Sequence, residues 1–366
     1  MDLNDIRKKI DTIDFEILKL LNSRMEYALR TRIFKREITD QKRESEVVQY
    51  IEKHAQGLIE PDFCKRLFAN IITESKRLQS ENLKLIGFQG EHGSFSEVAA
   101  RQFDPSLMFI SCDEFREIFE AVDTGLLHYG VVSVETTAGG TVADVSHLLI
   151  DTQLHIIGEV KIPTHYCLLA LPEEDPNEIR VVYSDRLALS QCQNYLAKSK
   201  LEGRPYYDSA GAAKMLLADR PKGSGAIASR FAADFYNLAV IESDIEDYNN
   251  YTRFLVLSKT PDGREGNKCS IVFATEHRAG ALFRVLKAFA DEGINLTRIE
   301  SMPNRNDPQN YLFFVDFHGS VSDAVVQRTL ERVQGMSTLY RFLGCYQEAI
   351  NSPLTKDPPK ASEAPK

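Results

Sequence analysis

The first 34 residues carry hydrophobic side chains at alternating spacings of three and four, from Leu3 to Phe34, with neither proline nor glycine between them. This period predicts one long amphipathic helix with a narrow, coiled-coil-like apolar stripe. Two shorter helices should follow, over about 42–54 and 61–79, the second opened by Pro61. Three helices alone bury little core, so we expect the long helix to pack against a second copy, giving a homodimer or higher homo-oligomer.

From Leu83 the pattern changes to short apolar runs, such as YGVVSV and TRFLVL, that alternate with helical stretches. This alternation is typical of an α/β domain with parallel or mixed sheets. After a polar linker at 261–268, the order strand, helix, strand, strand, helix, strand predicts a ferredoxin-like α+β fold. We therefore expect an all-helical domain at 1–82, an α/β domain at 83–262 and an α+β domain at 268–348, then a disordered, Pro- and charge-rich tail at 349–366.

Composition narrows the classes of function. The 366 residues include 44 Lys and Arg against 53 Asp and Glu, and this net charge of −9 argues against a nucleic-acid partner. The chain has no apolar run of about 18 residues, so we expect no membrane association, and its charged first residues do not resemble a secretory signal. The six cysteines lie far apart without a C-x-x-C pair. That spacing favours reduced thiols in the cytoplasm over disulfides or a zinc site.

A charged residue interrupts the apolar stripe of the first helix. Arg24 stands where Leu or Ile would be expected, and a buried charge needs an anionic partner. Lys35, three turns later, shares this face, and Ser75 and Gln79 continue the apolar side of the third helix. These four side chains could line a cationic, hydrogen-bonding pocket. Arg7 lies about 26 Å from Arg24 along the helix, so it would reach that pocket only from an antiparallel partner chain. The alternative is an exposed Arg7, an Arg24 paired with a nearby Glu, and a helical module that only dimerises.

The segments IRKKIDTIDFEILKLLNSRM, KRES and RLFANIITESKRLQS resemble the helical mutase domain of the bifunctional chorismate mutase–prephenate dehydratases, a resemblance that extends to about residue 348. It implies that Arg24, together with Arg7 from a partner chain, binds the two carboxylates of chorismate. Lys35 and Gln79 would donate hydrogen bonds to the ether oxygen, and Glu44 would accept one from the ring hydroxyl. The other matching pocket positions are Asp40, Arg43 and Ser75. The reaction is pericyclic, so the protein can only hold the reactive conformer and stabilise charge on the ether oxygen. No cofactor and no metal is implied.

The middle segment resembles prephenate dehydratase through five motifs in this order: GEHGSFSEVAA, VVSVETTAGGTV, YS and QC at 183–192, YDSAGAA and NYTRF. The resemblance implies two α/β lobes around a cleft, like a periplasmic binding protein, and conversion of prephenate to phenylpyruvate with loss of carbon dioxide and hydroxide. Hydroxide leaves poorly, so a donor must meet the departing oxygen, and the family pattern assigns this to Thr252. Arg253 would anchor the surviving carboxylate or form a structural ion pair. The other matching pocket residues are Glu135, Thr136, Ser184 and Gln191.

Two departures from the family pattern leave alternatives open. Relatives have V-P-I-E-N where this chain has VSVET at 132–136, and S-H-P where it has SDR at 184–186. Thr136 therefore replaces an amide by a hydroxyl of shorter reach. We keep three hypotheses: a dehydratase that makes phenylpyruvate, a non-catalytic phenylalanine sensor with a degenerate cleft, and a prephenate decarboxylase that does not aromatise its substrate.

The last domain resembles the ACT domain, a small amino-acid-binding module. GAL at 280–282 matches the family, and ESMP at 300–303 matches E-S-R-P with Met in place of Arg. Gly280 opens a helix whose free backbone N–H groups suit a carboxylate. The resemblance implies phenylalanine as a feedback inhibitor bound between the paired sheets of two protomers; the alternative is a purely structural dimerisation domain. The expected effector-binding residues are Gly280, Ala281, Leu282, Asn295, Leu296, Glu300 and Ser301.

Overall fold

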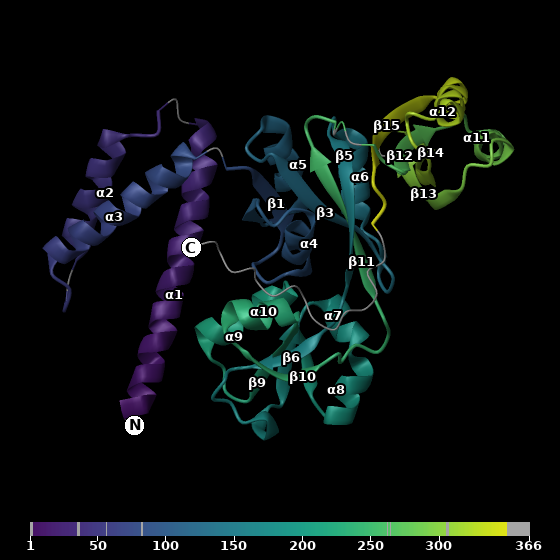
Figure 1. Cartoon of the computed structure of the whole chain (residues 1–366). Helices are drawn as coiled ribbons and strands as arrows, with labels where there is room; N and C mark the ends of the chain where they lie inside the picture. The colour runs from purple at the N-terminus through teal and green to yellow at the C-terminus, as the bar shows by residue number, and fades with distance from the viewer. Residues whose placement is uncertain are drawn as a thin grey trace. The chain divides into compact units, whose positions relative to one another are not determined.

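The computed structural model describes residues 3–34, 37–55, 57–81, 83–261, 263, 265–304 and 307–349. Its contacts divide the chain into two units, Met1–Lys84 and Leu85–Lys366 (Figure 1). The predicted tail lies outside the described residues from position 350 onward, and so does Lys35. No helix in the described part of the chain is long and apolar enough to cross a membrane.

The first unit is all-helical, as predicted. Helix α1 spans Leu3–Arg30 and continues as a 3-10 turn over Thr31–Phe34; α2 spans Gln41–His54 and α3 spans Pro61–Ser80. Helix α3 packs against both α1 and α2, and this packing positions the polar residues of the candidate mutase site.

The apolar stripe of α1 is uncovered in the single chain. Its hydrophobic side chains are 42–71% exposed, namely those of Leu3, Ile6, Ile10, Ile13, Ile17 and Leu20. Among the described residues of this unit, the buried hydrophobic side chains are Leu29, Ile51 and Ile71. A continuous exposed apolar face of this kind is typical of an interaction surface. The covering second chain stays a prediction.

The second unit begins with a mixed sheet of strand order β2-β1-β3-β11-β5, with β4 paired to β3. Strand β1 runs parallel to β2 and β3, whereas β11 runs antiparallel to β3 and β5. The strands are β1 (Leu85–Gln89), β2 (Met108–Cys112), β3 (Tyr129–Thr136), β4 (Gly140–Thr141), β5 (His155–Pro163) and β11 (Tyr251–Ser258). The helices of this lobe are α4 (Phe95–Phe103), α5 (Phe115–Thr124) and α6 (Ala143–Asp151).

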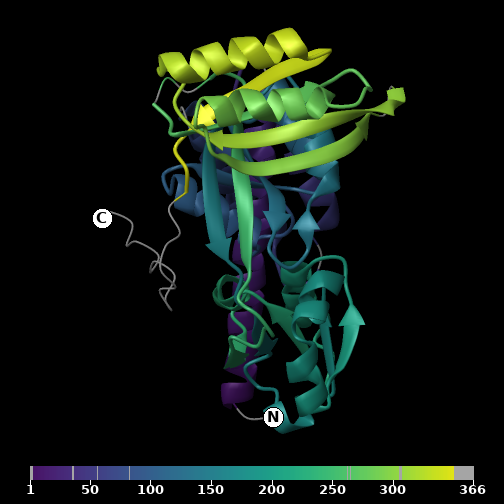
Figure 2. The ribbon, with the colours of Figure 1, turned by 90° about the vertical axis from the view of Figure 1, so that its right-hand side faces the viewer.

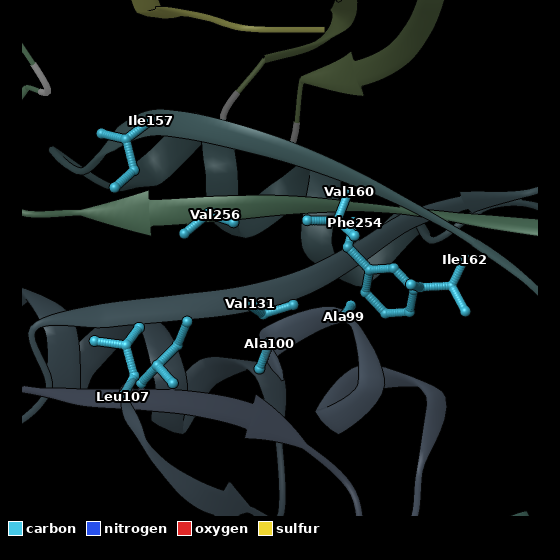
Figure 3. Packing of buried hydrophobic residues seen from close by; sticks show 10 residues of the cluster. Ala99, Ala100, Leu107, Val131, Ile157, Val160, Ile162, Phe254 and Val256 are labelled. Carbon is cyan, nitrogen blue, oxygen red and sulfur yellow. The ribbon is translucent and has the colours of Figure 1, made fainter. Parts of the chain in front are cut away.

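The two faces of strand β11 have different neighbours. Phe254 and Val256 point toward α4 and form a core with Ala99, Ala100 and Val131 (Figure 3). Successive side chains of a strand point to opposite faces of the sheet. The side chain two positions before Phe254 therefore shares the α4 face, and the one immediately before it points to the opposite face.

A second sheet, of order β10-β6-β9-β7-β8, forms the other lobe. The chain passes between the lobes twice, from β5 to β6 and from β10 to β11 (Figure 1). Its strands are β6 (Cys167–Ala170), β7 (Val181–Ser184), β8 (Glu202–Pro205), β9 (Ser224–Ala228) and β10 (Ala239–Ser243). Its helices are the 3-10 turn Pro176–Glu178, α7 (Arg186–Gln191), α8 (Gln193–Ser199), α9 (Ser209–Asp219) and α10 (Arg230–Tyr236).

The last sheet has the predicted ferredoxin-like element order, with strands arranged β13-β14-β12-β15. Its strands are β12 (Lys268–Ala274), β13 (Leu296–Asn304), β14 (Asp307–His318) and β15 (Leu339–Tyr346). Helices α11 (Ala281–Asp291) and α12 (Ala324–Met336) lie along one face of this sheet (Figure 2). They share one hydrophobic core with it.

Strand β15 also packs against β5 of the first lobe. Gly344 permits this approach, because a Cβ at that position would lie 2.1 Å from the Ile156 carbonyl oxygen. Nearby, the Arg341 guanidinium donates to the carbonyls of Leu149 and Leu154 at 3.1 and 2.9 Å. The last sheet is therefore bound directly to the lobe that carries Thr252.

Candidate functional site

The centre of the helical unit brings together three of the predicted pocket residues. Arg24 Nη1 of α1 donates to Ser75 Oγ of α3 at 2.5 Å, and Ser75 is buried. Burial lowers the pKa of the Arg24 guanidinium, and no carboxylate among the described residues forms an ion pair with it. One turn along α3, the buried Gln79 Nε2 donates to the Ala28 carbonyl at 2.6 Å. A partly buried guanidinium and a buried amide donor therefore lie close together between α1 and α3.

The N-terminal end of helix α2 holds three further predicted mutase residues: Asp40, Arg43 and Glu44. Asp40 caps the helix by accepting a bond from the Arg43 backbone N–H at 2.9 Å. The Arg43 side chain is exposed and pairs with Glu46 at 3.3 Å. Arg7 is exposed on α1, and nothing brings it near Arg24 within one chain.

Glu44 has a partner that the sequence analysis missed. Lys76, the residue after Ser75, places its Nζ 3.0 and 3.1 Å from the two carboxylate oxygens of Glu44. Both side chains line a cavity of ≈ 410 Å³ between α2 and α3. Lys76 lies among several charged residues of α3, so its spacing alone did not distinguish it from a solvated helix position.

In the second unit, Thr252 lies at the start of β11 on the face of the sheet that α4 covers. Its Oγ1 is 3.0 Å from Oγ1 of Thr164, and both side chains are buried. Thr164 follows the end of β5 and begins the connection to the second lobe. Thr252 therefore stands where the two lobes join, with its hydroxyl held by a second hydroxyl that the sequence analysis did not single out.

Gln191 presents an unused hydrogen-bond donor near this junction. Asn250 Oδ1 accepts from the backbone N–H of Ala138 at 3.2 Å, which fixes the orientation of the Asn250 amide. Asn250 Nδ2 then donates to Gln191 Oε1 at 2.9 Å, so the amide of Gln191 is fixed as well. Its buried Nε2 has no hydrogen-bond partner among the described residues. A buried, unsatisfied donor is costly, and a ligand oxygen would satisfy it.

The two departures from the family pattern have local structural roles. Thr136 Oγ1 accepts from the Gly139 backbone N–H at 2.7 Å in the turn that leads to β4. Asp185 caps α7 by accepting from the backbone N–H groups of Leu187 and Ala188 at 2.9 and 3.0 Å. Ser184, one residue earlier, is fully buried and donates to the Ile227 carbonyl at 2.6 Å.

Glu135 and Arg253 lie on the opposite face of the sheet from Thr252. They are cross-strand neighbours, as Thr136 and Thr252 are. Arg253 is only 4% exposed and its Nη1 is 3.3 Å from a carboxylate oxygen of Glu135. The register therefore places Glu135, Thr136, Thr252 and Arg253 together at one end of β3 and β11. Thr252 faces α4, whereas Glu135 and Arg253 face the other side of the sheet.

The predicted effector residues occupy two places in the last domain. Gly280, at a φ of 76°, precedes α11, which begins at Ala281 and includes Leu282. Asn295 is exposed before β13, and Leu296 begins that strand. Glu300 accepts from Ser146 Oγ of α6 at 3.4 Å and also pairs with Arg298, whereas Ser301 is exposed.

One group of potential metal ligands is found among the described residues. His165, Asp244 and Glu246 could bring their ligand atoms within 4.8 Å of one another. Glu246 already accepts a 2.9 Å bond from the Tyr166 backbone N–H and lies 2.6 Å from His165 Nδ1. Asp244 Oδ1 lies 3.4 Å from the same His165 nitrogen, so contacts among protein groups account for the arrangement of the three side chains.

Comparison with known families divides the chain into three matched segments. Residues 6–80 match chorismate mutase type II, residues 86–262 match prephenate dehydratase and residues 270–335 match the ACT domain. The fold class expected from the sequence, with a helical domain, a two-lobed α/β domain and a ferredoxin-like domain, is therefore confirmed.

Individual relatives match over most of their length. The bifunctional chorismate mutase/prephenate dehydratase of Aquifex aeolicus is 33% identical, covering 95% of this chain and 99% of that protein. The chloroplastic arogenate dehydratase/prephenate dehydratase 2 of Arabidopsis thaliana is 38% identical, covering 78% of each. The solved structure of prephenate dehydratase in complex with L-Phe from Arthrobacter aurescens has a TM-score of 0.68 and 28% identity, covering 75% of this chain and 93% of that one.

Proposed function

The chain belongs to the bifunctional chorismate mutase/prephenate dehydratase family. From this premise we propose that two of its domains catalyse consecutive reactions and that the third regulates them. It is an enzyme of phenylalanine biosynthesis that rearranges chorismate to prephenate and then converts prephenate to phenylpyruvate. Phenylalanine, bound by the ACT domain, inhibits it. The observation that carries this function is the match to both catalytic domains and the ACT domain, in order, along one chain.

In the mutase, catalysis depends on fixed donors rather than on proton transfer. Arg24, whose guanidinium lacks an ion-pair partner among the described residues, binds one carboxylate of chorismate. Lys35 and Gln79 direct donors at the ether oxygen as its bond breaks. Glu44, held by Lys76 at 3.0 Å, accepts from the ring hydroxyl. Asp40, Arg43 and Ser75 complete the pocket.

We propose that this pocket needs two chains and that the enzyme is a cytoplasmic homodimer. The exposed apolar stripe of α1 supports this arrangement, because burying such a stripe against a second helix drives coiled-coil pairing. An antiparallel partner would bring its Arg7 to Arg24, a distance of about 26 Å that a single helix cannot close. The second carboxylate of chorismate is then bound by that arginine.

In the dehydratase, Thr252 keeps its proton and donates a hydrogen bond to the departing oxygen, which stabilises the negative charge on that oxygen as it leaves as hydroxide. Its bond to Thr164 supports this role, since it orients the hydroxyl at the junction of the lobes. Gln191 Nε2, which has no hydrogen-bond partner in the described part of the chain, binds a substrate oxygen, and Asn250 sets the direction of the Gln191 amide. Thr136 and Ser184 line or support the same pocket. Glu135 acts from the opposite face of the sheet, through its ion pair with Arg253. Aromatisation of the ring drives the reaction, so the site needs to weaken one C–O bond rather than supply a strong acid.

The effector site is assigned to the residues expected from the ACT pattern. The backbone N–H groups that follow Gly280 bind the carboxylate of phenylalanine, with Ala281, Leu282, Asn295 and Leu296 around it. Glu300 and Ser301 lie further along β13 and contribute from the same strand.

Identification of the product from prephenate tests the function most directly. The wild-type chain is incubated with chorismate, with prephenate or with arogenate, the last because of the name of the Arabidopsis relative, and products are identified by mass spectrometry. Phenylpyruvate from prephenate supports the proposal. A non-aromatic keto acid would favour the decarboxylase hypothesis, and phenylalanine binding without any product would favour the sensor.

A further inference from the structure

Arg253 follows the proposed hydrogen-bond donor in the chain, yet its side chain points away from it. Thr252 meets Thr164 on the α4 side of the sheet, whereas Arg253 extends from the other side toward the ACT domain. Arg253 is one of the most deeply buried charged residues, with 4% of its surface exposed. A buried guanidinium requires compensating charge, so its partners indicate what the residue does.

Those partners come from both domains. From the dehydratase domain, Glu159 of β5 lies 2.7 Å from the Arg253 guanidinium and Glu135 of β3 lies 3.3 Å from it. From the ACT domain, Asp316 of β14 lies 2.6 Å from Nη1, and the Tyr346 hydroxyl of β15 accepts from Nη2 at 3.1 Å. Burial alone would lower the pKa of Arg253, but these neighbours, Asp316 foremost, raise it. The guanidinium therefore remains charged and joins two strands of each domain.

The ACT side of this cluster is itself held firmly. Ser270 of β12 donates to Asp316 at 2.5 Å and lies 2.7 Å from the Tyr346 hydroxyl. Lys268, also of β12, donates to Glu159 at 2.9 Å. Every one of these side chains is buried. Because these side chains are buried and bonded to one another, a displacement of the ACT sheet would also move Arg253.

A second contact links the cluster to the strand that carries expected effector residues. Arg298 of β13 lies 3.4 Å from Glu135 and also pairs with Glu300. Glu135 thus touches both arginines, one on the catalytic strand β11 and one on β13. Next to Glu135, Val134 of β3 has no partner on β11, which marks a bulge in β3, and such bulges re-aim side chains of the bulged strand.

We propose that Arg253 is a positioning residue rather than a substrate ligand, and that its ion pair with Asp316 transmits phenylalanine binding in the ACT domain to Thr252. This inference rests on the proposed function and adds the route by which the effector acts. Because Thr252 and Arg253 share one stretch of backbone, a shift of the guanidinium redirects the threonine hydroxyl. The effector then lowers turnover without contacting the substrate.

The test uses Asp316→Asn in the full-length chain, with Asp291→Asn as the matched control. Asp291 also pairs with a lysine and an arginine, at 2.5 and 3.5 Å, but entirely within the ACT domain. Three quantities are measured: the rate of phenylpyruvate formation, the phenylalanine concentration that halves it, and the phenylalanine affinity without substrate, by calorimetry. We expect Asp316→Asn to bind phenylalanine within about threefold of wild type while the inhibitory concentration rises about tenfold or more. Asp291→Asn should match wild type in all three.

Inhibition of Asp316→Asn at the wild-type concentration of phenylalanine would overturn the inference. Should that variant fail to fold, Tyr346→Phe decides, because it removes only the hydroxyl that accepts from Arg253. A rise of about threefold or more in its inhibitory concentration supports the route, and unchanged inhibition overturns it. A wild-type chain that forms no phenylpyruvate, or that phenylalanine does not inhibit, refutes the proposed function itself and is recognised before any variant is made.

Discussion

Replacing Thr252 by valine removes one hydroxyl and keeps the shape of the side chain. Thr252 is buried beside the hydrophobic core that contains Phe254, and its hydroxyl is 3.0 Å from Thr164 Oγ1. The isosteric valine preserves this packing, so the cost in stability should be limited to the buried Thr164 hydroxyl that loses its partner, about 1–3 kcal/mol. Loss of a donor to developing negative charge costs about 100- to 1,000-fold in turnover, or about 3–4 kcal/mol. The loss in the free energy of catalysis should therefore be larger than the loss of folding stability.

The assay follows phenylpyruvate formation from prephenate, and mutase activity of the same chain serves as the internal standard for folding. Thr164→Val is the matched control, because it breaks the same hydrogen bond but leaves the Thr252 hydroxyl in place; its turnover should fall less than about tenfold. Thr252→Ser should restore most of the activity. A folded Thr252→Val enzyme within tenfold of wild type, or an equal loss in Thr164→Val, would refute the assignment of Thr252 as the hydrogen-bond donor to the leaving oxygen.

Three further predictions concern the other parts of the chain. Arg24→Ala should lower mutase turnover at least about 100-fold through loss of a carboxylate ligand, with phenylpyruvate formation from prephenate unchanged; loss of both activities in a folded chain would contradict the division between domains. Mixing Arg7→Ala chains with Arg24→Ala chains should restore about a quarter of the mutase activity, because half of the random dimers are hybrids with one intact pocket of two; no recovery after exchange would exclude a shared pocket. Burial raises the pKa of Asp208 from its usual 3.8 to about 6. Between about pH 4 and 6 the folded chain therefore keeps a proton that the unfolded chain has lost, and its stability falls as the pH rises. Asp208→Asn keeps the α9 cap and should reduce that fall, by at most about 3 kcal/mol, in urea unfolding at pH 4 and 7; an unchanged pH profile would show that Asp208 titrates normally.

The arrangement of Arg253 changes how the NYTRF segment is understood. A threonine followed by an arginine could suggest a hydrogen-bond donor beside a substrate anchor. In a strand these two side chains point to opposite faces, and here the arginine is surrounded by carboxylates of its own protein at 2.6 to 3.3 Å. The geometry favours the ion-pair alternative, so one short segment would serve both catalysis and its control.

The sequence by itself determined the class and order of the domains. The period of three and four in α1, the short apolar runs and the final βαββαβ order are local signals, because each depends on neighbouring residues only. Arg24 could also be found this way, since a charge on an apolar stripe is anomalous within one helix. The match of motifs along the chain then predicted both activities.

Only the tertiary structure decided which of those residues meet. Lys76 beside Glu44, Thr164 beside Thr252 and Asn250 beside Gln191 are contacts between residues 32, 88 and 59 positions apart, and no local period encodes such pairs. Likewise, the sequence left open whether Arg253 anchors the substrate or forms an ion pair. The ion pairs of Arg253 became apparent only from the packing of the ACT sheet against the first lobe. Strand register and domain docking set these distances, and both follow from packing of the whole chain rather than from any single segment.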